Sequence, residues 1–467
     1  MQGVQLYGRS RMLRWLLGSR EPQGAAEKSA VYNINEEQPQ NPYTELQALE
    51  GHHDIVRYLI KVDDYRFASA GDDGIVFLWN VQTGERLAEL HGHTQQITAI
   101  AVLSRSNLSQ QKSHRILTAS SDRTVYIWDV DTGKQLHTLS DFYSTVKCLI
   151  VLEHLSLWLS GGNDLRVWNF EWELQCKTDT FDDSGISAII EIPKNCIVAA
   201  VDRELIIFKL TLPTEEYPNY NIIELKRLYD HQDNIRALSN VNDNTFVSGS
   251  HAGEMMVWDS LTGTLKADEC GFWVVSPPAD SHSGIKMLRQ QNEVSVQNII
   301  SDGKYIFIAV GRGIYVYSLE TKSVIACQRT AHDLNVLFIS EVSSRQLMSC
   351  SEDGNVRIWE LREYQPSPEA SSGFFSMWGF GRPNKQASHV VKKKPESTVC
   401  HKLDLIGDLI GHSGAVQMFL YFEEHMLVTC SADHLVIIWK NGELESRLRS
   451  SALFHKLEQE NGLQLCL

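Results

Sequence analysis

The chain lacks the short motifs by which many enzymes and metal-binding proteins are recognised. Its 467 residues hold no phosphate-binding loop, dinucleotide-binding fingerprint, HExxH pair or nucleophile elbow. Nine cysteines are present, but no two lie closer than 20 positions, which excludes a CxxC redox pair and a zinc knuckle. Their odd number and irregular spacing suit a reducing compartment. We therefore expect no enzyme activity, no cofactor and no metal, with Cys350 and Cys430 as small core residues.

Long apolar runs and an excess of positive charge are also missing. No stretch of about 18 apolar residues occurs, so we expect no transmembrane segment. The formal net charge is −15, which argues against general nucleic-acid binding because neutralising phosphates requires a basic face. The remaining composition, 43% hydrophobic and 22% charged, is ordinary for a globular protein and allows a sizeable core.

The feature that the chain does contain is a repeated ending. Eight times an apolar, strand-like run leads into one aromatic residue, and a polar residue usually follows. The closing residues are Trp79, Trp128, Trp168, Phe208, Trp258, Tyr317, Trp359 and Trp439. Their successive intervals are 49, 40, 40, 50, 59, 42 and 80 residues, obtained by subtracting positions. A period of about 40–45 residues is typical of propeller blades, each of them a four-stranded antiparallel sheet.

The turn residues fit the same interpretation. Asp72-Asp73-Gly74 and Glu352-Asp353-Gly354 lie between two strand-like runs and have the Asp and Gly that tight turns prefer. After the closing aromatic, Thr83-Gly84 and Asn441-Gly442 are expected to turn the chain into an outermost strand. Periodicity and turn chemistry therefore indicate one architecture.

On these motifs the chain resembles the WD40 family over roughly residues 44–446. The family's Gly-His dipeptide matches at Gly51-His52, Gly92-His93 and Gly411-His412. In the family a His, a strand Ser or Thr, a turn Asp and the Trp form a buried hydrogen-bonded tetrad. The resemblance implies three complete sets: His93, Ser120, Asp122 and Trp128; His332, Ser351, Asp353 and Trp359; His412, Ser431, Asp433 and Trp439.

Two further repeats are incomplete on this alignment. Gly71 occupies the Ser position of the first repeat, and Ala252 replaces the Asp of the fifth. Ser, His and Asp together also suggest a hydrolase triad, but a set that recurs in repeat after repeat indicates a structural role. We therefore expect these histidines to hold the blades together.

The predicted fold is an all-β propeller with eight blades, and seven is the alternative if one degenerate repeat is not a blade. A ring must join its ends, or one blade is left with an exposed edge. Thr44–Leu49 precedes the first Gly-His where an outermost strand is expected, so it should complete the last blade. Four segments are predicted: a flexible leader over 1–40, the propeller over 41–446, a long loop over 361–402 within it, and a C-terminal helix or tail over 447–467.

The doubled interval between the last two closing aromatics contains the loop. Residues 361–402 carry seven Lys or Arg and three Glu, so they are basic within an acidic chain, and their prolines mark them as flexible. Four aromatics and a methionine are crowded there between glycines: Phe374, Phe375, Met377, Trp378 and Phe380. These side chains either fold back onto the propeller or insert into a partner. The second interpretation is favoured, because an exposed aromatic cluster without a partner invites aggregation.

The C-terminal segment has apolar residues at helical spacing. Leu448, Leu453, Phe454 and Leu457 share one face of a predicted helix. A helix this short is marginal alone, so it docks either on its own blade or on a partner.

Three segments resemble one branch of the WD40 family more closely than the family at large: Asn41–Leu46, Glu191–Asn195 and the aromatic run of the loop. This resemblance implies a non-catalytic scaffold or adaptor subunit that joins two longin/DENN-domain proteins and acts in autophagy. It also implies that the loop, through Phe374 to Phe380, binds a lysosomal PQ-loop amino-acid transporter. A cytoplasmic protein would then be recruited peripherally to the lysosomal membrane, with the terminal strand and helix as candidates for the DENN-domain contact.

Two other functions remain as alternatives. Substrate receptors of cullin-RING ligases in the WD40 family often show Trp-Asp-x-Arg endings, and the nearest match here is Trp359-Glu360-Leu361-Arg362, with Glu in place of Asp. Direct lipid binding is the second alternative, since basic residues beside aromatics suit the anionic cytoplasmic face of a membrane.

Overall fold

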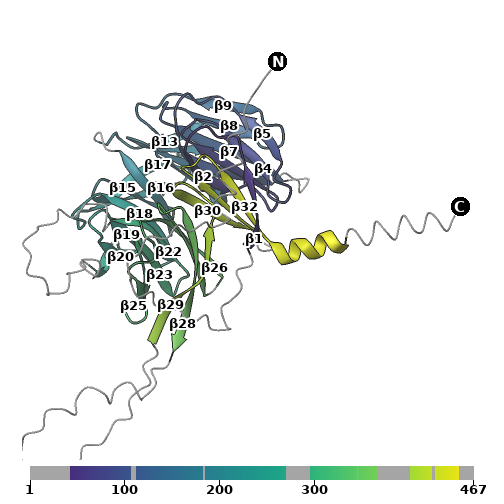
Figure 1. Ribbon diagram of the computed structural model, residues 1–467. Helices are drawn as coiled ribbons and strands as arrows, with labels where there is room; N and C mark the ends of the chain where they lie inside the picture. The colour runs from purple at the N-terminus through teal and green to yellow at the C-terminus, as the bar shows by residue number, and fades with distance from the viewer. Residues whose placement is uncertain are drawn as a thin grey trace, which may run out of the picture. The chain divides into compact units, whose positions relative to one another are not determined.

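The fold was analysed in a computed structural model of the chain. It describes residues 43–106, 112–181, 185–269, 295–343, 345–364, 400–422 and 426–451. These residues form eight four-stranded antiparallel sheets (Figure 1). The eight-bladed propeller predicted from the repeat is therefore confirmed, and the seven-bladed alternative is wrong.

The first four blades follow one another along the chain. Blade one consists of β2 (Val56–Lys61), β3 (Arg66–Gly71), β4 (Val76–Asn80) and β5 (Arg86–Leu90). Blade two consists of β6 (Ile97–Ser106), β7 (Lys112–Ser120), β8 (Val125–Asp129) and β9 (Gln135–Leu139). Blade three consists of β10 (Cys148–Leu152), β11 (Leu157–Gly161), β12 (Leu165–Asn169) and β13 (Leu174–Lys177), with the 3-10 turn η1 (Glu153–Leu155) after β10. Blade four consists of β14 (Ile186–Ile192), β15 (Cys196–Val201), β16 (Glu204–Thr211) and β17 (Asn221–Leu228).

The next three blades repeat this plan, and the eighth combines the two ends of the propeller. Blade five consists of β18 (Ile235–Asn242), β19 (Thr245–Ser250), β20 (Met255–Asp259) and β21 (Leu265–Glu269). Blade six consists of β22 (Val296–Ser301), β23 (Tyr305–Val310), β24 (Gly313–Ser318) and β25 (Ser323–Gln328). Blade seven consists of β26 (Val336–Ser343), β27 (Gln346–Ser351), β28 (Asn355–Tyr364) and β29 (Cys400–Ile410). Blade eight consists of β30 (Val416–Phe422), β31 (Met426–Ser431), β32 (Val436–Asn441) and β1 (Tyr43–Leu49).

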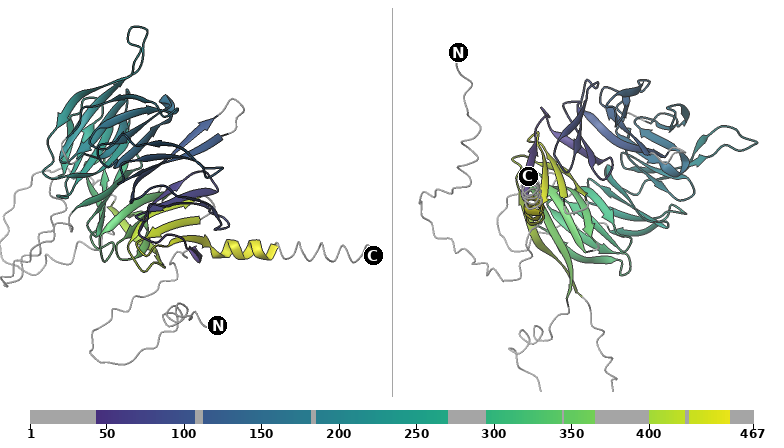
Figure 2. Two further views of the ribbon diagram at one scale, coloured as in Figure 1. Left: turned by 90° about the horizontal axis from the view of Figure 1, so that it is seen from above. Right: turned by 90° about the vertical axis from the view of Figure 1, so that its right-hand side faces the viewer.

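The ring closes through β1. The first strand of each blade contacts the first strand of the next, and β30 contacts β2, so the blades form a complete circle (Figure 2). β1 pairs antiparallel with β32, with Leu46 opposite Trp439. The prediction that an N-terminal strand completes the last blade is confirmed, and β32 is not left as an open edge.

The core lies between adjacent blades. At the junction of blades eight and one, Trp79 packs in one buried cluster with Phe67, Phe422 and Met426. The third strands are buried almost throughout because a blade is covered on both faces, which explains their nearly continuous apolar runs. Cys350 and Cys430 lie in this core as predicted, and burial raises the pKa of both thiols.

Two predicted boundaries are wrong. Residues 361–364 and 400–402 do not belong to the loop, because β28 and β29 continue past the ring as a two-stranded ribbon that ends with Tyr364 opposite Cys400. Asn441-Gly442 does not turn into an outermost strand, because β1 already holds that place. A helix instead begins at residue 442, five residues before the predicted start, and is described to residue 451. In the described ranges, no helix is long and apolar enough to cross a membrane.

The closing strand offers a direct test of how much ring closure contributes to stability. Leu49 is 5% exposed whereas Leu46, in the same strand, is 50% exposed. We expect Leu49→Ala to lower the free energy of unfolding by about 2–5 kcal/mol, because it leaves a cavity beside blade one. Leu46→Ala is the control and should change it by about 0.5 kcal/mol or less. Chemical denaturation would measure both, and equal effects would mean that β1 is only loosely attached.

Candidate functional site

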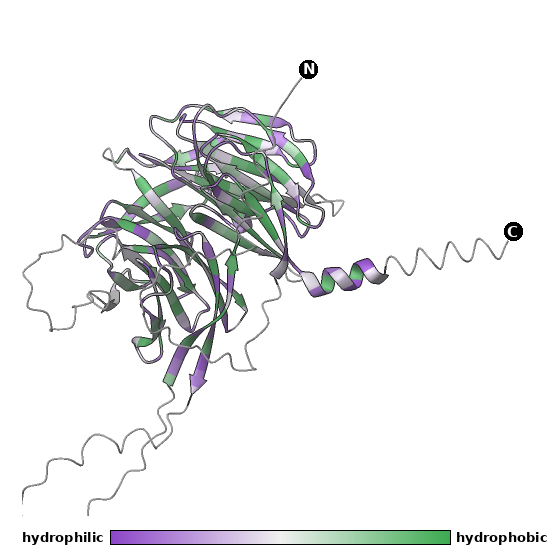
Figure 3. Ribbon diagram, viewed as in Figure 1, coloured by the Kyte–Doolittle hydropathy of each residue, from purple (hydrophilic) through white to green (hydrophobic). Residues whose placement is uncertain are grey.

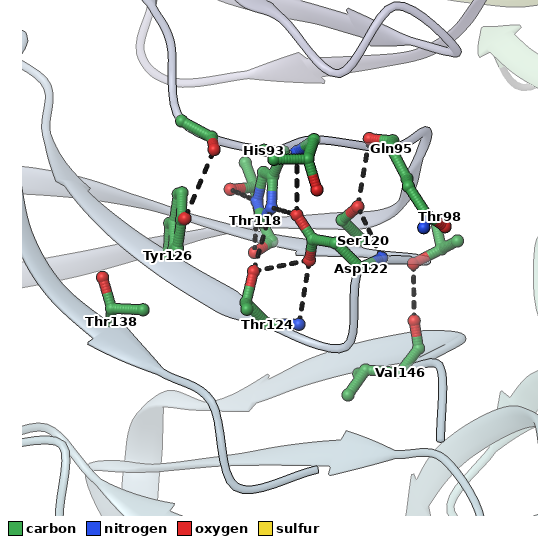
Figure 4. Close-up of polar contacts among 12 residues, drawn as sticks. His93, Gln95, Thr98, Thr118, Ser120, Asp122, Thr124, Tyr126, Thr138 and Val146 are labelled. Atoms are coloured by element: carbon green, nitrogen blue, oxygen red, sulfur yellow. Dashed lines mark hydrogen bonds and ion pairs between the residues drawn. The ribbon is translucent and has the colours of Figure 1, made fainter. Parts of the chain in front are cut away.

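The Ser, His and Asp sets form hydrogen-bonded networks inside the blades. In blade two, Nδ1 of His93 lies 3.0 Å from Oδ2 of Asp122, and Nε2 lies 2.9 Å from Oγ1 of Thr118 (Figure 4). The indole N–H of Trp128 donates to the same Thr118 oxygen at 2.9 Å. One hydroxyl therefore joins the imidazole to the indole, and Asp122 holds the other side of the ring.

The hydroxyl members of the three predicted tetrads are wrong. Ser120, Ser351 and Ser431 do not contact the histidines; each accepts the backbone N–H of the turn Asp at 3.1–3.2 Å. The bridging hydroxyls are two positions earlier, on Thr118, Ser349 and Thr429. Residues i and i+2 of a strand share a face, so spacing alone does not distinguish the two positions.

The two incomplete repeats also form networks, one through the same shift and the other through a different carboxylate. In blade one Ser69 bonds both His52 (2.8 Å) and Trp79 (2.9 Å), so Gly71 never occupied the hydroxyl position. In blade five Glu254 supplies the carboxylate, 3.2 Å from His231, and Ser248 is the bridging hydroxyl. The longer Glu side chain reaches the imidazole although its residue lies outside the expected turn position. The spacing of the motif did not predict this.

The electrostatics of these networks indicate a structural role. Burial disfavours ionisation of Asp353, but hydrogen bonds from His332 and from two backbone N–H groups outweigh it and lower its pKa to about 2. Burial also disfavours ionisation of Asp433, but hydrogen bonds from His412 and from two backbone N–H groups lower its pKa to about 2. The bridging hydroxyl of Thr118 is fully buried and already bonded to an indole, so it has no path to a substrate. Among the described residues, no three His, Cys, Asp or Glu side chains are grouped as metal ligands.

A candidate interaction site lies where the regular blade pattern breaks. We use the name lower face for one face of the ring. This face carries the turns between first and second strands and the turns between third and fourth strands. β28 and β32 are the third strands of neighbouring blades and both end at this face. β29 and β1 begin there, because each pairs antiparallel with its partner. The long loop and the C-terminal helix therefore leave the ring from adjacent blades on one face.

The start of the C-terminal helix is fixed by local chemistry. The side-chain Oδ1 of Asn441 accepts the backbone N–H groups of Glu443 and Leu444, each at 3.1 Å, which is an N-cap. Arg449 forms an ion pair with Glu45 of β1 at 2.9 Å, linking the helix to the closing strand. Leu448, one of the predicted contact residues, is 56% exposed. Leu453, Phe454 and Leu457 lie outside the described residues.

The ribbon of β28 and β29 is polar where it leaves the ring (Figure 3). Arg362 pairs with Glu360 across 2.6 Å and Lys402 pairs with Asp404 across 2.5 Å. These pairs are largely exposed, so they keep the ribbon hydrated rather than anchor it. The predicted anchor residues, Phe374, Phe375, Met377, Trp378 and Phe380, lie outside the described residues.

Comparison with known proteins identifies the family. A sequence model of the WDR41 β-propeller family matches residues 12–449. The chain is 60% identical to human WD repeat-containing protein 41 over 98% of its own length and 100% of that protein. The chain belongs to the WDR41 β-propeller family. The mouse protein of the same name is 59% identical over 97% of this chain and 98% of its own length.

Solved structures support the fold of this WDR41 family member. The crystal structure of the computationally designed Ika8 protein matches with a TM-score of 0.60 and 20% identity, covering 84% of this chain and 98% of the designed one. At that identity the likeness concerns the fold alone. Membership in a WD-repeat propeller family points to a non-enzymatic repeat protein that works through protein–protein contacts.

The corrected tetrads can be tested with two neighbouring serines of blade seven. Ser349→Ala removes the hydroxyl that serves both His332 and Trp359, so two buried groups lose a partner, and we expect a loss of about 1–3 kcal/mol in unfolding free energy. Ser351→Ala removes one hydrogen bond from the Asp353 backbone N–H and should lower the free energy of unfolding by less than Ser349→Ala does. Urea denaturation of both variants decides the assignment, and a larger effect of Ser351→Ala would contradict it.

Proposed function

We propose that this WDR41 family member is a non-catalytic scaffold that brings a complex of two longin/DENN-domain proteins to lysosomes. In this proposal the closing strand β1 and the C-terminal helix hold the DENN-domain partner. The loop between β28 and β29 binds a lysosomal PQ-loop amino-acid transporter through its aromatic run. The protein would be cytoplasmic and only peripherally bound to the membrane, with a role in autophagy.

The observation that carries the proposal is that these two segments leave neighbouring blades at one face. The helix follows β32 in blade eight, and the loop joins β28 to β29 in blade seven. Each extends from a strand that is fixed in the ring, so two partners bound there would be tethered to the same face. The half-exposed Leu448 and the ion pair between Arg449 and Glu45 make the helix and β1 one continuous surface.

The loop is tested by replacing Phe374, Phe375 and Trp378 with Ala. Aromatic anchors commonly contribute about 2 kcal/mol or more each when fully buried in an interface, so recruitment should be abolished. Fluorescence microscopy of the tagged protein would measure its overlap with a lysosomal marker, and co-purification would show that the DENN-domain partners remain bound. The matched control is an exchange of Lys392, Lys393 and Lys394 for Gln, which keeps the aromatics.

Three outcomes would contradict the proposal. Unchanged lysosomal recruitment of the triple variant would mean that the aromatics are not the anchor. Flotation of the purified protein with anionic liposomes that lack any transporter would favour direct lipid binding. Recovery of a cullin-ligase adaptor without DENN-domain proteins would favour the ligase alternative.

The helix is tested by Leu448→Asp. Because this side chain is already 56% exposed, the change should leave the melting temperature unaltered while placing a charge in the proposed partner contact. We expect co-purification of the DENN-domain partners to be lost. Leu261→Asp, at a residue 52% exposed in blade five, is the control and should retain them. Retention by both variants would exclude the helix as the contact.

A further inference from the structure

A hollow lies on the lower face at the junction of blades five and six. A cavity of about 600 Å³ opens between blades five and six, where the turns at residues 242–245 and 303–304 meet the turn at 319–322. A smaller cavity of about 350 Å³ adjoins it, formed by His154, residues 191–195 and residues 240–243. Asn242 lines both, so the two form one groove across blades three to six.

The larger cavity exists because this junction is filled by smaller side chains than its counterpart between blades eight and one. Strand register aligns Asn242 with Phe422 and Thr245 with Met426, and both Asn242 and Thr245 line the cavity. Phe422 and Met426 are buried against Trp79, whereas the residue at the Trp79 position of blade six is Tyr317. Three large side chains are thus replaced by three smaller ones at one end of the junction, and the space they would occupy remains open.

The walls of the larger cavity are apolar and its rim is charged. Val257 and Tyr317 are almost completely buried and form the floor, with Leu319 beside them. Lys304 and Lys322 lie exposed on the rim together with the single acid Glu320. The lining therefore carries one net positive charge, although the whole chain carries −15.

The smaller cavity is built from the segment Glu191–Asn195, one of the three that distinguish this branch of the family. Its turn places Lys194 and Asn195 at φ of 65° and 55°, a left-handed conformation that residues other than glycine adopt at a cost. The side-chain amide of Asn240 donates to the carbonyl of Glu191 at 2.5 Å and joins blade five to this turn. Polar amides and a strained turn thus line the groove beside the apolar cavity. This part also carries Lys194 against Glu191 and Asp243, so the excess of positive charge is confined to the rim of the larger cavity.

We propose that this groove binds an extended segment of a partner protein, with one bulky apolar side chain in the cavity between blades five and six and an acidic residue beside it. The apolar side chain would cover Val257, Tyr317 and Leu319, and an adjacent Asp or Glu would face Lys304 and Lys322. The peptide backbone would continue past Asn242 toward Asn195 and Asn240. The lining of the two cavities includes no residue of β28, β29 or the helix, so the site does not depend on the function proposed above, although Glu363 of the ribbon interacts electrostatically with Lys304.

The chemistry of the groove selects this occupant. A cavity of about 600 Å³ is in the size range of specific binding pockets. Burying a large aliphatic or aromatic side chain against its apolar floor is favourable. Two rim lysines attract a carboxylate and repel a basic peptide. An extended backbone presents unpaired N–H and C=O groups. The amide of Asn240 uses one N–H on Glu191 and has a second N–H and an acceptor oxygen that can bond such groups.

The proposal is tested by selecting a random twelve-residue peptide library displayed on phage against the full chain. We expect enriched peptides to share a bulky apolar residue next to Asp or Glu. A synthetic peptide of that consensus would then be measured by fluorescence anisotropy. Two variants should each weaken its binding about tenfold or more, equivalent to at least about 1.4 kcal/mol. The first, Asn242→Phe with Thr245→Met, refills the cavity as blade eight does, and the second is Lys304→Glu with Lys322→Glu.

The matched control is Lys134→Glu with Lys177→Glu, two exposed lysines of blades two and three, which should leave the affinity unchanged. The melting temperature of each variant establishes that it is folded. If the cavity-filling variant fails to fold, the charge-reversed variant decides the question. The proposal is overturned if no peptide is enriched, if the consensus is basic or lacks an apolar residue, or if the charge-reversed variant binds like the control.

Discussion

The pairing of β1 with β32 is the interaction on which the propeller depends. Every other blade is made from one continuous stretch of chain, but blade eight takes three strands from the C-terminal end and one from the N-terminal end. Without β1, β32 would be an open edge in a ring whose core lies between blades. Because the buried clusters join each blade to its neighbour, a defect at this seam exposes core residues of blades one and eight together.

The same closure explains why the unusual segments lie together. The chain that follows β32 does not form the fourth strand of blade eight, because β1 takes that place. It can therefore adopt a different secondary structure. Asn441 caps a helix there instead of starting a turn. In blade seven the loop separates the fourth strand from the third in the sequence. The ribbon of β28 and β29 extends beyond the ring and leads into that loop. The proposed partner contacts use these two departures from the repeat.

The hydrogen-bonded tetrads and the groove show opposite consequences of repeat variation. Blade five keeps its network because Glu254 substitutes for the turn Asp, so the blade is preserved despite a changed sequence. Blade six replaces Trp with Tyr317, and its junction with blade five opens a cavity. Compensated changes preserve packing, whereas uncompensated reductions in side-chain size at an interblade junction leave space for a ligand.

The sequence by itself determined the all-β repeat, the number of blades, the closing strand and the place of the long loop, because strand periodicity and the spacing of aromatics are local properties. It could not distinguish Ser120 from Thr118 or Ser351 from Ser349, since both residues of each pair point to the same side of a strand. It also missed Glu254 and the cap at Asn441, whose roles depend on which groups lie nearby in space. The groove was decided only by the tertiary structure. Its walls come from four blades, and its volume depends on side chains that are adjacent in the ring but far apart in the chain.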